Sequence, residues 1–292
     1  MKSVKQVLVL GATLLSTGVI AQVSLPFYDS FPTTYGVGNR LGDAPSSTLW
    51  SYGNSPGSYS PYFTNIDLSY PMLVDQVDLG VQVITNASGS NRDRGVPLNY
   101  QPGVNFSGPL YFSYLLRVDQ GAANRTNVIS FTRNSSGTGG SITPGVAVFL
   151  EPNGQVSISK YDLANAVETG VSLSLEQTYL IVGRYTVVSG SGNDPFDIWI
   201  NPSPATLGVP EASVPTPTLS ITTGPDQTWL YGFYFTSKAG TTAWQGGAQF
   251  VVDDLRLGTT WADVTPVVPE PTTVLLSMLG GFGLLLLRLR RK

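Results

Sequence analysis

The 292-residue sequence contains no cysteine. Disulfide bonds, a cysteine nucleophile, thiolate metal sites and a lipid-modified cysteine anchor are therefore all excluded. The cross-links that stabilise many secreted domains are not available to this chain. Its stability has to come from the burial of apolar side chains.

Histidine is also absent, which removes the most common general base and the most common metal ligand. Charged residues make up only 12% of the chain. Removing the six basic residues near the two ends from the 16 Lys and Arg, and Glu270 from the 19 Asp and Glu, leaves 10 basic and 18 acidic residues. The middle of the chain thus carries about −8, which disfavours nucleic acid and anionic lipid as partners.

Glycine and proline are abundant, at 32 and 21 residues, in a chain that is 11% aromatic. This combination indicates many short strands joined by turns rather than disorder. Alternating or aromatic runs between turn residues predict strands at residues 110–118, 127–132, 145–150, 155–161, 178–188, 196–200, 229–235 and 250–257. Only residues 260–264 suggest a helical turn. The sequence therefore predicts an all-β fold over residues 22–266, with two antiparallel sheets packed as a sandwich.

One hairpin can be assigned in detail. The pair Asn153-Gly154 lies between two of the predicted strands and is a strong signal for a tight β-turn. Because side chains alternate along a strand, Val156, Ile158 and Lys160 should share one face of the second strand. The serines between them should lie on the other face.

Residues 1–21 have the features of a secretory signal peptide. Lys2 and Lys5 precede an apolar run at residues 7–20, which ends at Ala21 as a small residue for cleavage. Such a segment is removed from the mature chain and takes no part in the fold. The sequence predicts that the rest of the protein is exported.

The other end contains a short apolar segment, residues 272–287, followed by Arg288, Arg290, Arg291 and a final lysine. As a helix these 16 residues would be about 24 Å long, shorter than a hydrocarbon core of about 30 Å. The arginine side chains can extend to the lipid headgroups, which compensates for the short length of the helix. The sequence therefore predicts a transmembrane helix, and the basic residues after it predict a cytoplasmic C-terminus. The alternatives are an ordinary tail anchor and a buried core helix, and the lack of a polar side argues against the second.

Residues 267–292 contain Pro269, Glu270 and Pro271, then the apolar segment, then the basic terminus. This order resembles the PEP-CTERM sorting signal of Gram-negative bacteria. The resemblance implies an inner-membrane intermediate, cleavage by the membrane protease exosortase, and delivery to the cell surface or an extracellular matrix. The resemblance indicates where the protein is sent, and it says nothing about the activity of the domain that precedes the signal.

A second resemblance concerns that domain. Residues 179–185 with 197–202, and residues 251–264, look like the closing strands of laminin-G-like, concanavalin-A-like jelly rolls, and residues 27–31 look like the opening strand. The resemblance implies that the first and last strands pair. It also implies a structural calcium ion held by Asp29 and Asp253, since calcium prefers oxygen ligands. The alternative is that Asp29 caps a turn and Asp253 is solvated.

The β-glucanases of that fold carry a Glu-x-Asp-x-x-Glu strand, and none of the five glutamates here begins this pattern. Asp253 and Asp254 cannot replace it as adjacent strand residues, because they would point to opposite faces. We therefore expect a protein that is not an enzyme and that binds extracellular polysaccharide. The alternatives are a hydrolase or lyase with an aspartate-based site and a structural coat component without a ligand.

Carbohydrate-binding sites combine aromatic faces with nearby polar groups. Trp50, Tyr52, Tyr59 and Trp244 lie in Gly-, Ser- and Pro-rich surroundings and are the predicted ligand-binding aromatics. Trp199 and Trp229 lie within apolar strands and are predicted to be core residues, which is the usual role of an aromatic side chain.

Overall fold

The computed structural model describes residues 23–43, 46, 49–50, 52–53, 61–75, 77–85, 93–132, 144–160, 166–236 and 247–268. The predicted signal peptide, the predicted membrane segment, Tyr59 and Trp244 lie outside these residues. Within them, no helix has the length and apolar content needed to cross a bilayer.

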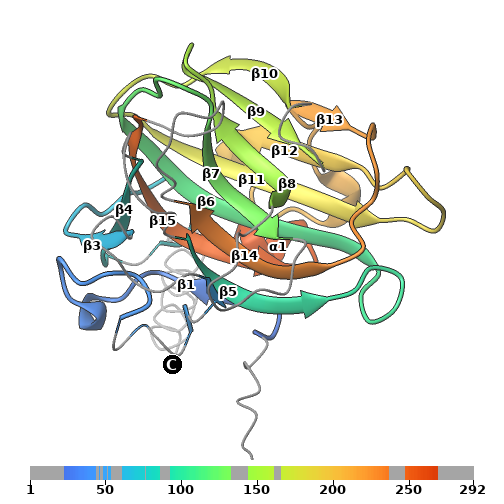
Figure 1. Ribbon diagram of the computed structural model, residues 1–292, viewed down its shortest axis with the longest axis horizontal. Helices are drawn as coiled ribbons and strands as arrows, with labels where there is room; N and C mark the ends of the chain where they lie inside the picture. Colours follow the sequence, from blue (N-terminus) through green and yellow to red (C-terminus); the bar gives the residue numbers. More distant parts are fainter. Residues whose placement is uncertain are drawn as a thin grey trace, which may run out of the picture.

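The described residues form two antiparallel sheets that stack face to face (Figure 1). The first sheet has eight strands. In spatial order they are β13 (Leu219–Ile221), β12 (Phe196–Ile200), β11 (Thr178–Val187), β6 (Gly108–Gln120), β15 (Gln249–Gly258), β4 (Gly80–Ile84) and β3 (Tyr62–Thr64), with β1 (Phe27–Asp29) also pairing with β15. The second sheet has seven: β10 (Val167–Ser172), β9 (Gln155–Ser159), β8 (Pro144–Leu150), β7 (Thr126–Thr132), β14 (Leu230–Thr236), β5 (Asp93–Tyr100) and β2 (Tyr52–Gly53).

Helix is almost absent from the described residues. The α-helix α1 (Trp261–Val264) is capped by Thr260, whose hydroxyl accepts a hydrogen bond from the Asp263 amide. Three short 3₁₀ turns, η1 (Thr33–Tyr35), η4 (Pro204–Thr206) and η5 (Glu211–Ser213), complete the set. The prediction of an all-β sandwich of two antiparallel sheets is confirmed.

The main core fills the space between the two sheets. Its centre is a group of rings in which Phe112 of the first sheet contacts Phe131 and Phe233 of the second, with centroid distances of 5.6 and 5.4 Å. Gly183 on the neighbouring strand makes this packing possible, because a β-carbon there would collide with the Phe112 ring. Burial of this aromatic cluster is the main contribution that joins the sheets.

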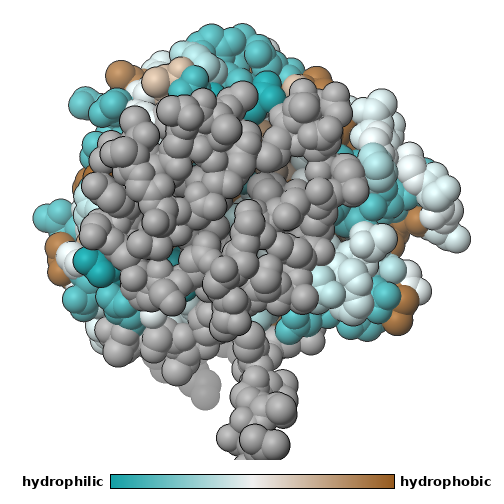
Figure 2. Space-filling view, in the orientation of Figure 1, coloured by the Kyte–Doolittle hydropathy of each residue, from teal (hydrophilic) through white to brown (hydrophobic). Residues whose placement is uncertain are grey.

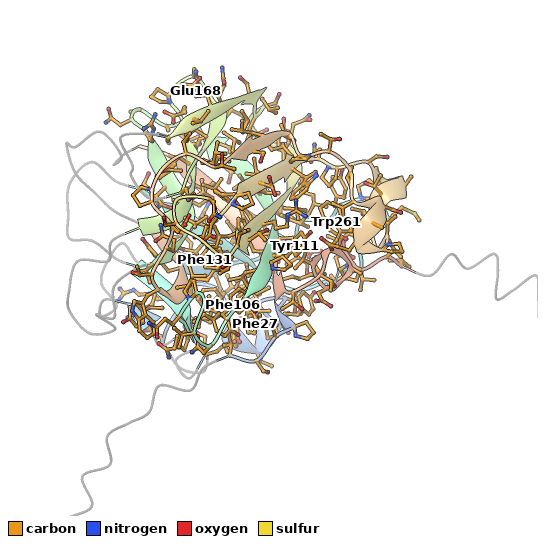
Figure 3. All side chains as sticks on the ribbon, turned by 90° about the vertical axis from the view of Figure 1, so that its right-hand side faces the viewer. Phe27, Phe106, Tyr111, Phe131, Glu168 and Trp261 are labelled. Carbon is orange, nitrogen blue, oxygen red and sulfur yellow. The ribbon has the colours of Figure 1, made fainter. Side chains whose placement is uncertain are left out.

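A second apolar cluster covers the opposite face of the eight-stranded sheet. It includes Tyr111, Leu115, Trp199 and Trp261, with the Trp199 and Trp261 rings 5.1 Å apart. Figure 3 shows Tyr111 and Trp261 close together and separated from Phe131. The eight-stranded sheet is thus buried on both faces, and the prediction that Trp199 is a core residue is confirmed.

The opening and closing strands meet as expected. Strand β1 runs antiparallel to β15, with Phe27 opposite Leu257 and Asp29 opposite Leu255. The Asn153-Gly154 hairpin joins β8 to β9, with Gly154 at φ +79°. Val156 and Ile158 enter the main core, and Lys160 is buried against Thr222 and Asp226, so the assignment of these three residues to one face is confirmed.

Candidate functional site: the polar face of the seven-stranded sheet

One sheet face remains outside both apolar clusters, and it carries polar side chains. In strand β8, Val146, Val148 and Leu150 point into the main core, so the alternate residues Ala147 and Phe149 face away from it. The strand register places polar residues of β7, β9 and β14 beside them. We call this polar layer the polar face and define it by Asn127, Ser130, Ser157, Ser159 and Tyr234, all of which are buried.

A row of small residues crosses the middle of the polar face. Ser159 is paired with Ala147, Ala147 with Ser130, Ser130 with Tyr234, and Tyr234 with Gly95 on β5. A β-carbon at Gly95 would collide with Tyr234, so glycine is needed beside this tyrosine. The row leaves Tyr234 as its one large side chain.

Asn127 is the unusual residue of this face. Its side-chain nitrogen donates a hydrogen bond to the Ser130 hydroxyl, while its Oδ1 atom is buried and accepts no hydrogen bond. The residue is only 1% exposed. Leaving a buried amide oxygen unpaired costs about 1–3 kcal/mol, so Asn127 lowers the stability of the fold at this position.

A charged pair lies at one corner of the face. Arg125 Nε is 2.5 Å from Glu151 Oε1, and the same oxygen accepts a hydrogen bond from the Ser157 hydroxyl. The Arg125 guanidinium also lies over the Phe149 ring, 5.9 Å from its centroid. The charges of Arg125 and Glu151 balance each other, and Glu168, opposite Ser157 on β10, adds a further carboxylate to this side of the sheet.

Aromatic side chains lie near the other corner. The rings of Trp229 and Tyr231 are stacked, with centroids 4.6 Å apart and planes 8° from parallel. Both are partly exposed, and Tyr231 packs against Tyr234 apart from the two main clusters. Trp229, predicted to be a core residue, therefore lies at the edge of the polar face. In the space-filling view, described hydrophobic residues form only small separate areas (Figure 2).

A cavity of about 880 Å³ lies at one end of the sandwich, between loops at residues 101–107, 187–194 and 225–228. Its acidic groups are already bound within the protein. Asp194 accepts hydrogen bonds from the Tyr185 hydroxyl and the Val188 amide, and Asp226 forms an ion pair with the buried Lys160 at 2.8 Å. These contacts stabilise the loops and leave the polar face as the better candidate.

Asp29 lies in the interior with three hydrogen-bond donors around it. Its Oδ1 accepts from the Phe31 amide at 2.8 Å and its Oδ2 from Trp50 Nε1 at 2.7 Å, with the Tyr35 hydroxyl 3.4 Å away. Burial raises the pKa of this carboxyl, against the effect of these donors. The hydrogen bond from the Phe31 amide makes Asp29 a turn-capping residue, which is the alternative to calcium binding that the sequence suggests for Asp29.

Asp253 lies on the other side of the sheet. Its two oxygens accept hydrogen bonds from the amides of Leu68 and Asp254, and Leu68 belongs to the second apolar cluster. Asp29 is paired with Leu255, a residue of the main core. The structure thus gives the two carboxylates separate partners, and no group of three potential metal ligands occurs within the described ranges. A calcium ion shared by Asp29 and Asp253 stays a prediction.

The aromatic residues predicted to bind a ligand differ in their positions. Trp50 is fully buried and stacks on Phe235 at 5.4 Å, so it has no face free for a ligand. Tyr52 belongs to β2 at the edge of the seven-stranded sheet. Tyr59, Trp244 and the sorting residues Pro269, Glu270, Pro271, Arg288, Arg290 and Arg291 lie outside the described residues.

A comparison with known protein families supports the sorting signal that was predicted at the C-terminal end of the chain. Residues 267–292 match the model of the PEP-CTERM protein-sorting motif. The protein is therefore exported and passes through the membrane for sorting, and the motif implies processing by exosortase, a membrane protease. No curated protein matches the sequence.

Solved structures resemble the fold. An alginate lyase, Aly36B, shares 15% identity over 80% of this chain and 98% of its own, with a TM-score of 0.49. A mutant of that lyase in complex with alginate trisaccharide gives 14% identity, 80% and 99% coverage and a TM-score of 0.46. A sialidase from Trypanosoma rangeli gives 14% identity, 72% of this chain and a TM-score of 0.39, and the match covers 30% of its length.

These neighbours are enzymes, and they correct the expectation that the protein is not one. The expectation depended on a missing carboxylate motif and missing histidine. Those absences exclude particular mechanisms only, because tyrosine and other side chains can also transfer protons.

A testable consequence of this geometry concerns pH and stability. Burial raises the pKa of Asp253 to about 9, compared with about 3.9 in an unfolded chain. Its stabilising contribution is complete below pH 4 and is lost as the pH rises through 9. We expect the free energy of unfolding to fall by about 2 kcal/mol between pH 7 and pH 9, measured by denaturant titration.

The variant Asp253→Asn should show a much smaller fall over this range. Asp226→Asn is the control: burial raises the pKa of Asp226, but Lys160 and the amides of Asp194 and Asn193 together outweigh it and lower the pKa below its ordinary value, so this carboxyl stays ionised between pH 7 and pH 9. An equal slope in wild type and Asp253→Asn would show that Asp253 is ionised throughout.

Proposed function

We propose that the protein is an exported polysaccharide-cleaving enzyme and that the polar face is its site. The observation that carries this proposal is the buried, unpaired amide oxygen of Asn127 on a sheet face lined with hydroxyl groups. Sugar hydroxyls can donate to this oxygen and accept from neighbouring serines. Trp229 and Tyr231 offer a flat, partly exposed surface for a sugar ring, and sites of this kind combine aromatic contacts with a few placed polar groups.

We propose elimination rather than hydrolysis as the reaction at the polar face. A glycosidase usually needs two carboxyl groups about 5–10 Å apart that are free to act. Here Glu151 is bound to Arg125 and Ser157, and Glu168, opposite Ser157 on β10, accepts a hydrogen bond from Asn153. An elimination on a uronic acid needs an amide or guanidinium to hold the sugar carboxylate and a side chain to move a proton. The second N–H of the Asn127 amide and the guanidinium of Arg125, which is shared with Glu151, suit the first role, and Tyr234 suits the second.

We also infer that the body is a jelly roll of the laminin-G-like or concanavalin-A-like type. The antiparallel sandwich and the β1–β15 pairing support this assignment. The sorting motif supports a final location at the cell surface or in the extracellular matrix of a Gram-negative bacterium.

Asn127→Ala should weaken polysaccharide binding with little effect on the stability of the fold. The variant removes an unpaired buried oxygen together with the hydrogen bond to Ser130, so the two effects offset each other and the free energy of unfolding should change by less than about 1 kcal/mol. Loss of one hydrogen bond to the ligand should weaken binding roughly tenfold. Affinity electrophoresis in gels containing neutral and uronate polysaccharides, alginate among them, would measure the effect.

The control for this variant is Asn39→Ala. Asn39 is an exposed amide that bonds the Tyr35 carbonyl far from the polar face, and its loss should leave binding unchanged. Equal binding by wild type and Asn127→Ala would remove the polar face from the proposal.

Tyr234→Phe separates cleavage from binding. Removing the hydroxyl should lower the turnover number by about 10²- to 10⁴-fold, as expected for loss of a proton-transfer group, with little change in affinity. The ultraviolet absorbance of the unsaturated product and the number of new reducing ends would follow the reaction. Product with new reducing ends but no unsaturation would assign hydrolysis instead, and binding without any cleavage would contradict the enzymatic proposal.

Processing at the sorting motif can be tested independently. Replacing Pro269, Glu270 and Pro271 with alanine should leave export intact, since the signal peptide is unchanged, and trap the full-length chain in the membrane fraction. Immunoblots of fractionated cells would show this. A processed form outside the cell would mean that the tail is an ordinary anchor.

A further inference from the structure

The chain is held to the folded body up to the residue before the Pro-Glu-Pro sequence. Leu73 and Val267 form an antiparallel bridge, the Val74 amide donates to the Pro266 carbonyl at 2.9 Å, and the Val268 amide donates to the Met72 carbonyl at 3.0 Å. Val267 also packs closely on Gly208. The described chain is therefore bound to the folded body as far as Val268.

The predicted membrane segment begins at Thr272, four residues later. Four extended residues span at most about 14 Å. The polar headgroup layer takes up part of this length, since it adds about 10–15 Å in total to a hydrocarbon core of about 30 Å. Before cleavage, the surface around Val268 must therefore lie at the headgroups.

That surface carries exposed apolar side chains. Met72, Val267 and Val268 are 42%, 38% and 46% exposed, and we call these three residues the exit surface. Met72 has φ +67°, an unfavourable conformation for a residue with a side chain, and its carbonyl accepts the bond from Val268. The backbone is thus held in a strained form that keeps these side chains together.

We propose that the exit surface is a membrane-contact surface, which rests on the lipid of the bilayer until the tail is cleaved. The short connection to Thr272 favours lipid as the partner, because any other partner would have to fit into the same narrow space. Asp67, Asp75 and Asp78 lie in the segment that bears Met72 and would be repelled by anionic headgroups. The surface suits zwitterionic lipid.

The absence of native cysteine allows a direct test, because a single introduced thiol can be labelled selectively. Val267→Cys places the label on the exit surface. Val167→Cys is the matched control, since Val167 is also 38% exposed and lies on β10, the edge strand of the other sheet. Met72→Cys is a second test variant if Val267→Cys does not fold.

Each unprocessed variant is labelled with an environment-sensitive dye and reconstituted in zwitterionic vesicles that contain a lipid-linked quencher. We expect several-fold stronger quenching at position 267 than at position 167, and loss of this difference after the tail is removed. Equal quenching at both positions in vesicle-bound protein would overturn the proposal and leave the anchoring intact. A signal at position 267 that requires the membrane protease would also overturn it, in favour of a protein partner.

Discussion

The burial of the eight-stranded sheet on both faces is the constraint on which the rest of the structure depends. Along β6, Phe112 and Tyr114 enter the main core, whereas Tyr111 and Leu115 enter the second cluster. An almost continuous apolar run is the pattern that such a strand needs. The central strands of this sheet are enclosed, whereas Tyr28 on β1 and Ser220 on β13 stay exposed at its margins.

The polar face follows from this arrangement. Along its strands, side chains alternate between the core and the outer side of the sheet, and β-bulges change this alternation on β7. One register shift lies between Asn127 and Ile129 on β7, and both Val128 and Ile129 reach the core. Asn127 is thereby set on the outer face beside Phe149, where its amide can contact Ser130. An unpaired polar group at such a position is costly in a stable fold and useful at a binding surface.

The longer strands could be predicted from the sequence, because hydrophobic alternation and turn residues mark them clearly. Each of the eight predicted segments overlaps an observed strand. Strand β5 is not predicted although it is eight residues long, because it contains Pro97, a residue that normally argues against a strand interior. The hairpin at Asn153-Gly154 was found because its turn chemistry is local.

The site was harder to predict, because burial depends on distant parts of the chain. Trp50 lies in Gly- and Ser-rich surroundings that suggest exposure, yet Phe31 and Phe235 enclose it. Trp229 lies in an apolar strand that suggests the core, yet a register shift between Leu230 and Gly232 accompanies its partly exposed position. Asp254 has φ +51°, so the simple alternation assumed for Asp253 and Asp254 does not hold at that bulge. No local signal distinguishes these cases.

The stacking of the sheets has a consequence for the order of events at the cell envelope. Leu73, next to the exit surface, belongs to the cluster on the outer side of the eight-stranded sheet, whereas the polar face lies on the outer side of the seven-stranded sheet. The body therefore acts as a spacer, about 10 Å between the sheets, that turns its polar side chains away from the bilayer. The proposed polysaccharide contact and the proposed membrane contact therefore use opposite sides of the sandwich, so under these two proposals ligand binding does not require prior release from the membrane.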